Sequence, residues 1–305
     1  MTLPNFFIVG AAKAGTSSVF RYMEQHPDIY FPDVKEPGYF AFAEADISFQ
    51  GPGDERLNNT VVTSMEDYLE LFADVKSEKM IGEASIVYLH NVDAARRIKN
   101  LLPDAKIIIV LRNPIDRALS SYAHKVRDGY EKVDSFMEAF SLGEERARLN
   151  WQHLWQYRDM SFDAEELERY FHAFPRENIA VYQYEELRDD PQKLLQNIFS
   201  FLGVDPAFVP EMSVRHNVLG RPRYRLVHQF FRESSYLKIC LKQLFPKKLR
   251  SKIRTQAMEK NISPEKNTIS EVDMAKLKAI YRDDTLKAQK LIGKDLSGWL
   301  WKYVS

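Results

Sequence analysis

The chain has 305 residues, 45% of them hydrophobic and 28% charged, which is the composition of an ordinary globular protein. Enough apolar surface is present to bury a large core, so disorder is excluded for most of the chain. The 43 basic and 43 acidic residues give a formal net charge of zero. We therefore expect no nucleic-acid partner held by whole-chain electrostatic attraction.

Cysteine usage and hydropathy indicate a compartment. Cys240 is the only cysteine, so no intrachain disulfide and no thiolate metal cluster can form. The N-terminal segment lacks the basic and long apolar regions of a signal peptide. No stretch approaches the roughly 18 apolar residues of a transmembrane helix. These features predict a cytoplasmic protein.

The chain begins with a strand, a loop and a helix. Residues 6–9 form a short apolar run, which predicts a buried strand. A helix is expected at 16–26, where Pro27 stops it. Residues 43–63 are rich in Gly, Asn and acidic side chains, and we expect a long surface loop there.

Strands and helices then alternate. Strands are predicted at 79–84, 105–111 and 179–184. Helices are predicted at 93–102, 116–127, 145–158 and 161–174, followed by one that Asp190 caps and Gly203 ends. This order predicts a single α/β domain over residues 1–305, with a P-loop-like three-layer fold in which helices flank a central parallel sheet.

The last part of the chain is helical and charged. Residues 232–260 hold nine Lys and Arg and two acids, within a basic helical segment at about 232–262. This segment either faces an anionic acceptor or a membrane surface, or is a partly buried helix with a solvated basic face, which we favour. A final amphipathic helix is expected at 271–292. Trp151 and Trp155 are expected in the core rather than as an acceptor platform.

Residues 10–18, with the sequence Gly-Ala-Ala-Lys-Ala-Gly-Thr-Ser-Ser, lie between the first strand and the first helix. Small residues let backbone amides close around an anion, and the helix N-terminus adds partial positive charge. A plain tight turn is the alternative. The predicted phosphate-binding residues are Lys13, Ala14, Gly15, Thr16, Ser17 and Ser18.

Two features separate this loop from that of nucleoside triphosphatases. Thr16 occupies the position of the usual lysine, and the lysine stands at position 13 instead. The strand at 105–111 leads into Arg112, where a triphosphatase has an acidic residue for Mg²⁺. Arginine repels a metal ion and attracts phosphate, so we expect an anionic nucleotide that is handled without a metal ion.

These two segments resemble the sulfotransferases that use 3′-phosphoadenosine 5′-phosphosulfate. The loop at 10–18 resembles their 5′-phosphosulfate motif. Residues 112–122 resemble their 3′-phosphate motif, in which Arg112 ends a strand and Ser120 follows eight residues later on a helix. We expect Arg112 to point to the surface and Ser120 to lie opposite the apolar stripe of its helix, so that both reach one phosphate.

Four further segments carry the resemblance, which covers nearly all of the chain and is least clear at 225–266. They are the KEPGYF segment at 35–40, the GEAS segment at 82–85 ahead of Tyr88, the YEEL segment at 184–187 and the DLSGW segment at 295–299. The first two resemble segments of the heparan-type and related bacterial members, and the last resembles the usual ending of bacterial members. In the third, Tyr184 corresponds to the tyrosine near the adenine.

The resemblance implies catalytic roles. Lys13 stabilises the departing 5′-phosphate oxygen, or binds ground-state charge only. Glu83 follows a strand end and is the expected general base, with His90 as the nearest rival and a structural carboxylate paired with a lysine as the alternative. Lys35 helps to hold the sulfuryl group, unless it is a plain surface lysine.

A basic loop at 216–223 contains Arg221 and Arg223. In family members a loop here closes over the 3′-phosphate, although this one lacks the pattern of the cytosolic enzymes. A plain exposed loop is an equal alternative.

The sequence thus predicts transfer of a sulfuryl group from 3′-phosphoadenosine 5′-phosphosulfate to a hydroxyl or amine of a small-molecule, glycan or lipid acceptor. A P-loop kinase and a non-catalytic nucleotide-binding protein are the alternatives. The missing lysine at position 16 and Arg112 oppose the first, and the full set of site residues opposes the second.

Overall fold

The structure is a computed structural model that describes residues 2–212, 221–222, 262–263 and 269–301. Its strands are β1 (Phe6–Gly10), β2 (Ile29–Tyr30), β3 (Met80–Ala84), β4 (Lys106–Leu111), β5 (Ile179–Gln183), β6 (Arg221–Pro222) and β7 (Ile262–Ser263). The α-helices of the first half are α1 (Thr16–Met23), α2 (Tyr39–Phe42), α3 (Glu55–Asn58), α4 (Met65–Glu70), α5 (Val87–His90), α6 (Ala94–Leu101) and α7 (Pro114–Arg127). Those of the second half are α8 (Phe136–Ser141), α9 (Gly143–Arg148), α10 (Ala164–Ala173), α11 (Tyr184–Asp189), α12 (Pro191–Leu202), α16 (Glu271–Ile292) and α17 (Ser297–Trp301).

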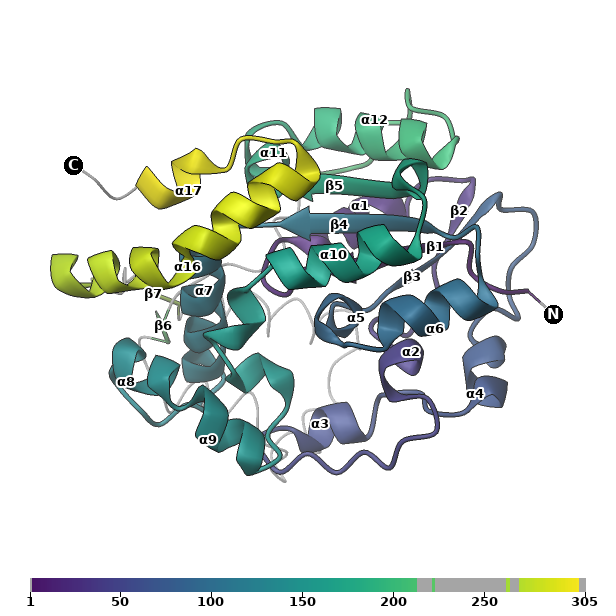
Figure 1. Ribbon diagram of the computed structural model, residues 1–305. Helices are drawn as coiled ribbons and strands as arrows, with labels where there is room; N and C mark the ends of the chain where they lie inside the picture. Colours follow the sequence, from purple (N-terminus) through teal and green to yellow (C-terminus); the bar gives the residue numbers. More distant parts are fainter. Residues whose placement is uncertain (1, 213–220, 223–261, 264–268, 302–305) are drawn as a thin grey trace, which may run out of the picture.

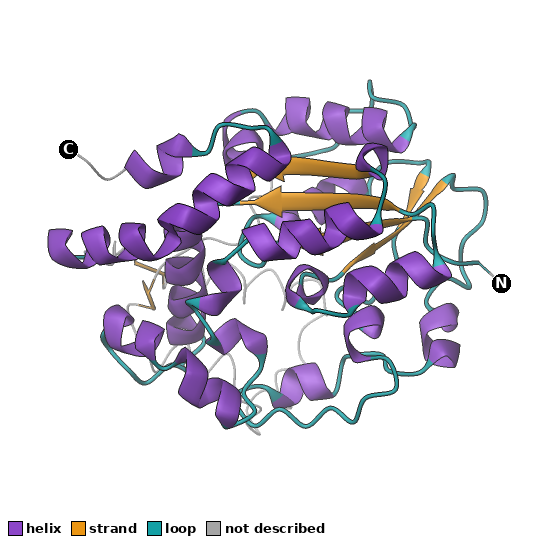
Figure 2. Ribbon diagram, in the orientation of Figure 1, coloured by secondary structure: helices purple, strands orange, loops and turns teal. Residues whose placement is uncertain are grey.

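The central sheet has five parallel strands in the order β2-β3-β1-β4-β5 (Figures 1 and 2). β1 pairs with β3 on one side and with β4 on the other. Every residue of β1 is buried, as are all residues of β4 after Lys106. Burial on both faces explains why these strands have uninterrupted apolar sequences. The predicted α/β class and parallel sheet are confirmed.

Helices cover both faces of the sheet and complete the predicted three-layer fold. In Figure 1, α6 and α10 lie in front of the strands, and α1 lies behind them. α10 packs against α6 and α16, whereas α1 packs against α12. The carboxyl ends of β1, β3 and β4 lead into the segments that carry the predicted site, as is usual in parallel α/β sheets.

Three predicted helices begin at side-chain caps, of which only the one at Asp190 was expected from the sequence. Asn113 caps α7 by accepting from the amide of Ile115 (2.9 Å), so this helix begins two residues earlier than predicted. Asp190 caps α12, which Gly203 ends with a φ of 82°. Ser270 accepts from the amide of Asp273 at the start of α16 (3.1 Å). Side-chain caps of this kind satisfy amides that have no partner inside a helix.

The helix predicted at 145–158 is wrong. α9 ends at Arg148, Asn150 has a φ of 56°, and only a short 3-10 turn follows at His153–Trp155. The cause is Asp54, which is buried and accepts hydrogen bonds from the Gln152 amide (2.8 Å), the Gln152 side chain (2.7 Å) and Trp155 Nε1 (3.1 Å). These tertiary bonds replace helical ones.

Two other helices are shorter than predicted. α1 ends at Met23 rather than at 26, and the His26 imidazole lies 3.1 Å from the Asp205 carbonyl oxygen. α10 begins at Ala164 rather than at 161, because the Asp284 carboxylate on α16 accepts from the amides of Asp163 (2.8 Å) and Ala164 (3.1 Å). The predicted positions of the remaining strands and helices are confirmed to within one or two residues.

The loop predicted at 43–63 is only partly a surface loop. It contains α3, and Asp54 within it is completely buried. Trp155 is buried and Trp151 is half-buried, so the core placement of this pair is confirmed. The basic segment at 232–262 lies outside the described residues except for Ile262, so its membrane contact stays a prediction.

Candidate functional site

The loop between β1 and α1 has a backbone that requires glycine. Lys13 and Gly15 have positive φ angles of 62° and 86°. A Cβ atom at Gly15 would lie 2.7 Å from Leu187 Cδ2 and 3.0 Å from Tyr184 Cδ2, both on α11. α1 begins directly after Gly15, so the first amides of a helix stand beside the loop. This is the arrangement that binds anions.

Lys35 reaches the loop from the segment between β2 and α2. Its Nζ atom donates to Ser17 Oγ (2.7 Å) and to Glu36 Oε1 (2.9 Å). Only 22% of the Lys35 side chain is exposed, so Lys35 belongs to the surroundings of the loop. The remaining predicted loop residues are buried or half-buried: Ala14, Thr16 and Ser18.

Lys13 points toward helix α7. Its Nζ atom lies 2.9 Å from His124 Nδ1. Burial, followed by the nearby charge of Arg127, lowers the pKa of Lys13 to about 8. A cation that burial destabilises in this way interacts strongly with any anion that enters its surroundings.

Arg112 joins the two predicted phosphate motifs. Its Nη1 atom donates to the carbonyl oxygen of Lys13 (3.1 Å), and its guanidinium lies 4.4 Å from the centre of the Tyr184 ring. The side chain is only 13% exposed, so the expectation that it points to the surface is wrong. The Tyr184 ring covers one face of the guanidinium. Arg112 Nε has no hydrogen-bond partner among the described residues.

Ser120 lies on α7 as expected and is buried, with 5% of the residue exposed. It sits two turns after the N-terminus of a helix that packs on the sheet. The backbone of β6, which contains Arg221, contacts the same helix. Arg221 pairs with Ser263 in a two-stranded antiparallel sheet. Arg223 lies outside the described residues.

Glu83 is completely buried near the end of β3. Its carboxylate accepts hydrogen bonds from Ser85 Oγ (2.6 Å), Tyr88 Oη (2.7 Å) and Tyr68 Oη (3.0 Å). Burial raises the pKa of Glu83 to about 7, although the three hydroxyl groups oppose this shift. Glu83 is therefore paired with hydroxyl groups and not with a lysine, and its pKa suits proton transfer near neutral pH.

His90 is the last residue of α5. Its Nδ1 atom lies 2.8 Å from Glu166 Oε1 on α10. Its ring centre is 6.2 Å from that of His153, whose Nε2 atom is buried without a partner among the described residues. Burial lowers the pKa of His153 to about 3, so this imidazole is neutral.

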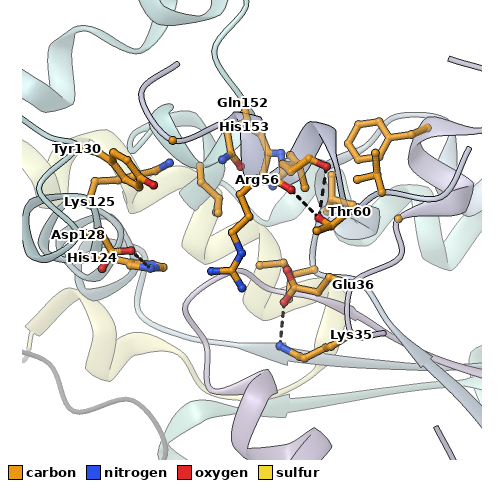
Figure 3. A pocket seen from close by; sticks show the side chains of 18 of the residues that line it. Lys35, Glu36, Arg56, Thr60, His124, Lys125, Asp128, Tyr130, Gln152 and His153 are labelled. Carbon is orange, nitrogen blue, oxygen red and sulfur yellow. Dashed lines mark hydrogen bonds and ion pairs between the residues drawn. The ribbon is translucent and has the colours of Figure 1, made fainter. Parts of the chain in front are cut away.

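A cavity of about 710 Å³ opens beside Lys35. Residues of α3 and α7 and of the segments around 36 and 153 line it, and apolar side chains such as Val34, Phe42 and Leu57 are among them. Figure 3 shows the Arg56 guanidinium between His124 and Glu36. Arg56 forms no ion pair within the described part of the chain, which leaves its charge available to a molecule in the cavity.

Comparison with known proteins identifies the family. A sequence profile described as the sulfotransferase family matches residues 4–208, which is more than half of the chain. The chain belongs to the sulfotransferase family. Its members are enzymes, and the matched range contains both phosphate motifs, Glu83 and the cavity.

Similarity to individual sulfotransferases extends over more of the chain. A crystal structure of a sulfotransferase from Alicyclobacillus acidocaldarius superimposes with a TM-score of 0.77 at 35% identity, over 98% of this chain and 99% of the other. The human bifunctional heparan sulfate N-deacetylase/N-sulfotransferase 3 is 29% identical over 68% of this chain but only 23% of its own length. The membrane-associated sulfotransferase kil1 of Dictyostelium discoideum is 22% identical over 77% of this chain and 64% of its own length.

The sequence analysis did not single out four residues that line the cavity beside the predicted site: His124, Asp128, Arg56 and His153. His124 had a signal, because it follows Ser120 by four residues and so shares its face of α7. Asp128 follows His124 by the same step. Arg56 and His153 belong to segments whose structure depends on Asp54. Local sequence patterns do not indicate such a long-range contact.

The described residues show neither a group of metal ligands nor a membrane-spanning helix. No group of three or more His, Cys, Asp or Glu side chains in that part of the sulfotransferase chain is arranged to hold a metal ion. Within the same ranges, no helix combines the length and apolarity needed to cross a bilayer.

Proposed function

We propose that this sulfotransferase moves a sulfuryl group from 3′-phosphoadenosine 5′-phosphosulfate to a hydroxyl or amine of an acceptor that binds in the cavity. The observation that carries the proposal is the contact between the two phosphate motifs. Arg112 donates to the carbonyl oxygen of Lys13 (3.1 Å), so one nucleotide with a phosphate group at each end can engage both motifs together.

The donor's two phosphates need different partners. The loop at 10–18, with Lys13 and the N-terminus of α1, suits the 5′-phosphosulfate. Arg112 and Ser120 suit the 3′-phosphate, with Arg221 on the strand beside α7. Tyr184, which stacks on Arg112, suits contact with the adenine. The positive charges of Lys13, Lys35 and Arg112 around the two motifs favour a nucleotide that is handled without a metal ion.

The reaction needs a base and a stabilised leaving group. The acceptor oxygen or nitrogen forms a bond to sulfur, and the bond from sulfur to the 5′-phosphate oxygen breaks. The electron pair stays on that phosphate oxygen, beside the Lys13 ammonium and with Lys35 nearby. The acceptor proton passes to Glu83, whose pKa of about 7 suits this role. His90 is the rival, although its Nδ1 atom is engaged by Glu166.

The cavity supports an acceptor with both apolar and polar parts. Its lining combines apolar side chains such as Val34, Phe42 and Leu57 with the exposed residue Arg56. Its volume of about 710 Å³ lies within the usual range for small-molecule sites. A small molecule, or one end of a glycan or lipid, fits this description.

Binding of the nucleotide product tests the proposal. We expect adenosine 3′,5′-bisphosphate to bind much more tightly than MgATP in calorimetry, because two separate phosphate sites are present. We also expect transfer of labelled sulfate from the donor to a component of host extracts, with a gain of one sulfate by mass spectrometry. Equal or tighter binding of MgATP would favour a kinase. Tight binding of the bisphosphate without any sulfate transfer would favour a non-catalytic protein.

A further inference from the structure

A chain of three polar side chains ends at the phosphate loop. The Lys13 ammonium lies 2.9 Å from His124 Nδ1. On the other side of the imidazole, His124 Nε2 lies 3.2 Å from Asp128 Oδ2. Arg127 Nε donates to the second oxygen of Asp128 (3.0 Å). Figure 3 shows His124, on α7, and Asp128, the residue that follows this helix, facing each other at the edge of the cavity.

The hydrogen-bond partners of His124 determine which nitrogen of its imidazole carries the hydrogen. Burial alone would raise the pKa of Asp128, but the hydrogen bond from His124 and the charge of Arg127 hold it well below its usual range. Asp128 is therefore an acceptor, and His124 Nε2 must carry the hydrogen. His124 Nδ1 is then a lone pair that accepts from the Lys13 ammonium.

The Lys13 ammonium benefits from this hydrogen-bond acceptor because the surroundings of Lys13 favour its neutral form. Burial is the largest of these effects, followed by repulsion from Arg127, and Arg112 adds to the repulsion. Asp128 and Glu36 act in the opposite direction. A neutral lysine could not stabilise a departing phosphate oxygen, so a neighbour that favours the ammonium form preserves its function.

We propose that His124, oriented by Asp128, is a positioning residue that aims the Lys13 ammonium and keeps it charged for the leaving oxygen. This inference rests on the proposed sulfuryl transfer. An ammonium has three N–H donors. One bond to His124 therefore leaves two donors for oxygens of the donor nucleotide, and Lys13 can remain in place during the reaction.

The same geometry gives His124 a role at each end of the pH range. Burial lowers the pKa of His124, and Lys13 and Arg127 lower it further, whereas Asp128 raises it. When the imidazole is protonated at low pH, two cations face each other and Lys13 loses its acceptor. When Lys13 is deprotonated at high pH, its charge is lost. Activity should therefore fall on both sides of neutral pH.

A purely structural pair is the alternative, since His124 and Asp128 are also four residues apart at the end of α7. The test compares His124→Phe with His124→Asn. The first keeps a ring but removes the hydrogen-bond acceptor Nδ1, and in the second an amide oxygen can replace Nδ1. His172→Phe is the matched control, because His172 is an exposed residue on α10. Turnover of the donor, with extract acceptor or with water, is measured between about pH 6 and 10.

We expect His124→Phe to lower kcat by about 100-fold near neutral pH, the loss typical of a misplaced catalytic group. The KM for the donor should change by less than about threefold, because most phosphate contacts remain. The alkaline limb of the profile should shift to lower pH. His124→Asn should recover most of the activity, and His172→Phe should behave as wild type.

Chemical labelling of Lys13 gives a second readout that needs no turnover. An acylating reagent attacks only the neutral amine, so mass spectrometry of Lys13 against pH reports its protonation. We expect more labelling at neutral pH in His124→Phe and, to a smaller extent, in Asp128→Asn, with the exposed Lys79 unchanged as an internal reference. Wild-type labelling and wild-type pH profiles in both variants would overturn the inference. If wild-type protein transfers no sulfate, the proposed function fails, and the labelling alone still decides the inference.

Discussion

Replacement of Arg112 by alanine tests the link between the two phosphate motifs. The guanidinium is 13% exposed, donates to the Lys13 carbonyl oxygen (3.1 Å) and stacks 4.4 Å from the Tyr184 ring centre. Because it is held in place before the nucleotide arrives, little of its binding energy is spent on ordering. A charge-assisted hydrogen bond to phosphate contributes about 2–3 kcal/mol. The expected loss of affinity is therefore about 30- to 150-fold.

The assay is calorimetric titration of adenosine 3′,5′-bisphosphate into Arg112→Ala and a matched control. Arg96→Ala serves as the control, since Arg96 is an exposed arginine on α6 that pairs with Asp93. Arg112→Lys keeps the charge but not the forked geometry, and its affinity should fall between the wild type and Arg112→Ala. The melting temperature of each variant shows whether the fold survives. Unchanged nucleotide affinity in a folded Arg112→Ala protein would refute the 3′-phosphate assignment.

Two further changes probe the base and the cavity wall. Glu83→Gln should lower kcat by about 10²–10⁴-fold with little change in nucleotide affinity, because it removes the base and keeps the shape of the side chain. In the wild type, kcat should rise with pH through about 7 as Glu83 ionises. Normal turnover in Glu83→Gln would assign the role of base to another group, and His90→Asn is therefore assayed beside it. Asp54→Ala should lower the free energy of unfolding in urea by about 3–5 kcal/mol, because it leaves the buried Lys125 ammonium, 3.6 Å away, without its carboxylate. Asp46→Ala is the control, because Asp46 is exposed. Equal stability of the two variants would contradict the role of Asp54.

Local pattern was sufficient for the layers of the fold. The runs at β1 and β4 are apolar throughout because both faces of these strands are buried. α12 and α16 are capped by Asp190 and Ser270 and end before glycines with positive φ. Each of these signals acts between residues close in the chain, so the sequence alone contains them.

Long-range contacts explain what could not be predicted. Asp54 reorganises residues 150–155 from about a hundred positions away, and Asp284 sets the start of α10 across a similar separation. The environment of Glu83 also depends on a distant residue, Tyr68 on α4. The contact between Lys13 and His124 joins two motifs that were each identified separately. Motif spacing places residues on elements but does not determine which side chains meet.

Hydrogen bonds of two buried or half-buried side chains anchor the cavity wall that contains α3. Asp54 ties the segment before α3 to the turn at His153–Trp155, and the Asn58 side chain accepts from the Phe49 amide (3.1 Å) and donates to the Phe49 carbonyl oxygen (2.9 Å). Between and after these two anchors, four positions face the cavity: Arg56, Leu57, Thr60 and Val61. If the acceptor binds in this cavity as proposed, a combinatorial library at these four positions, with both anchors retained, should change acceptor preference without altering Lys13, Arg112 or Ser120.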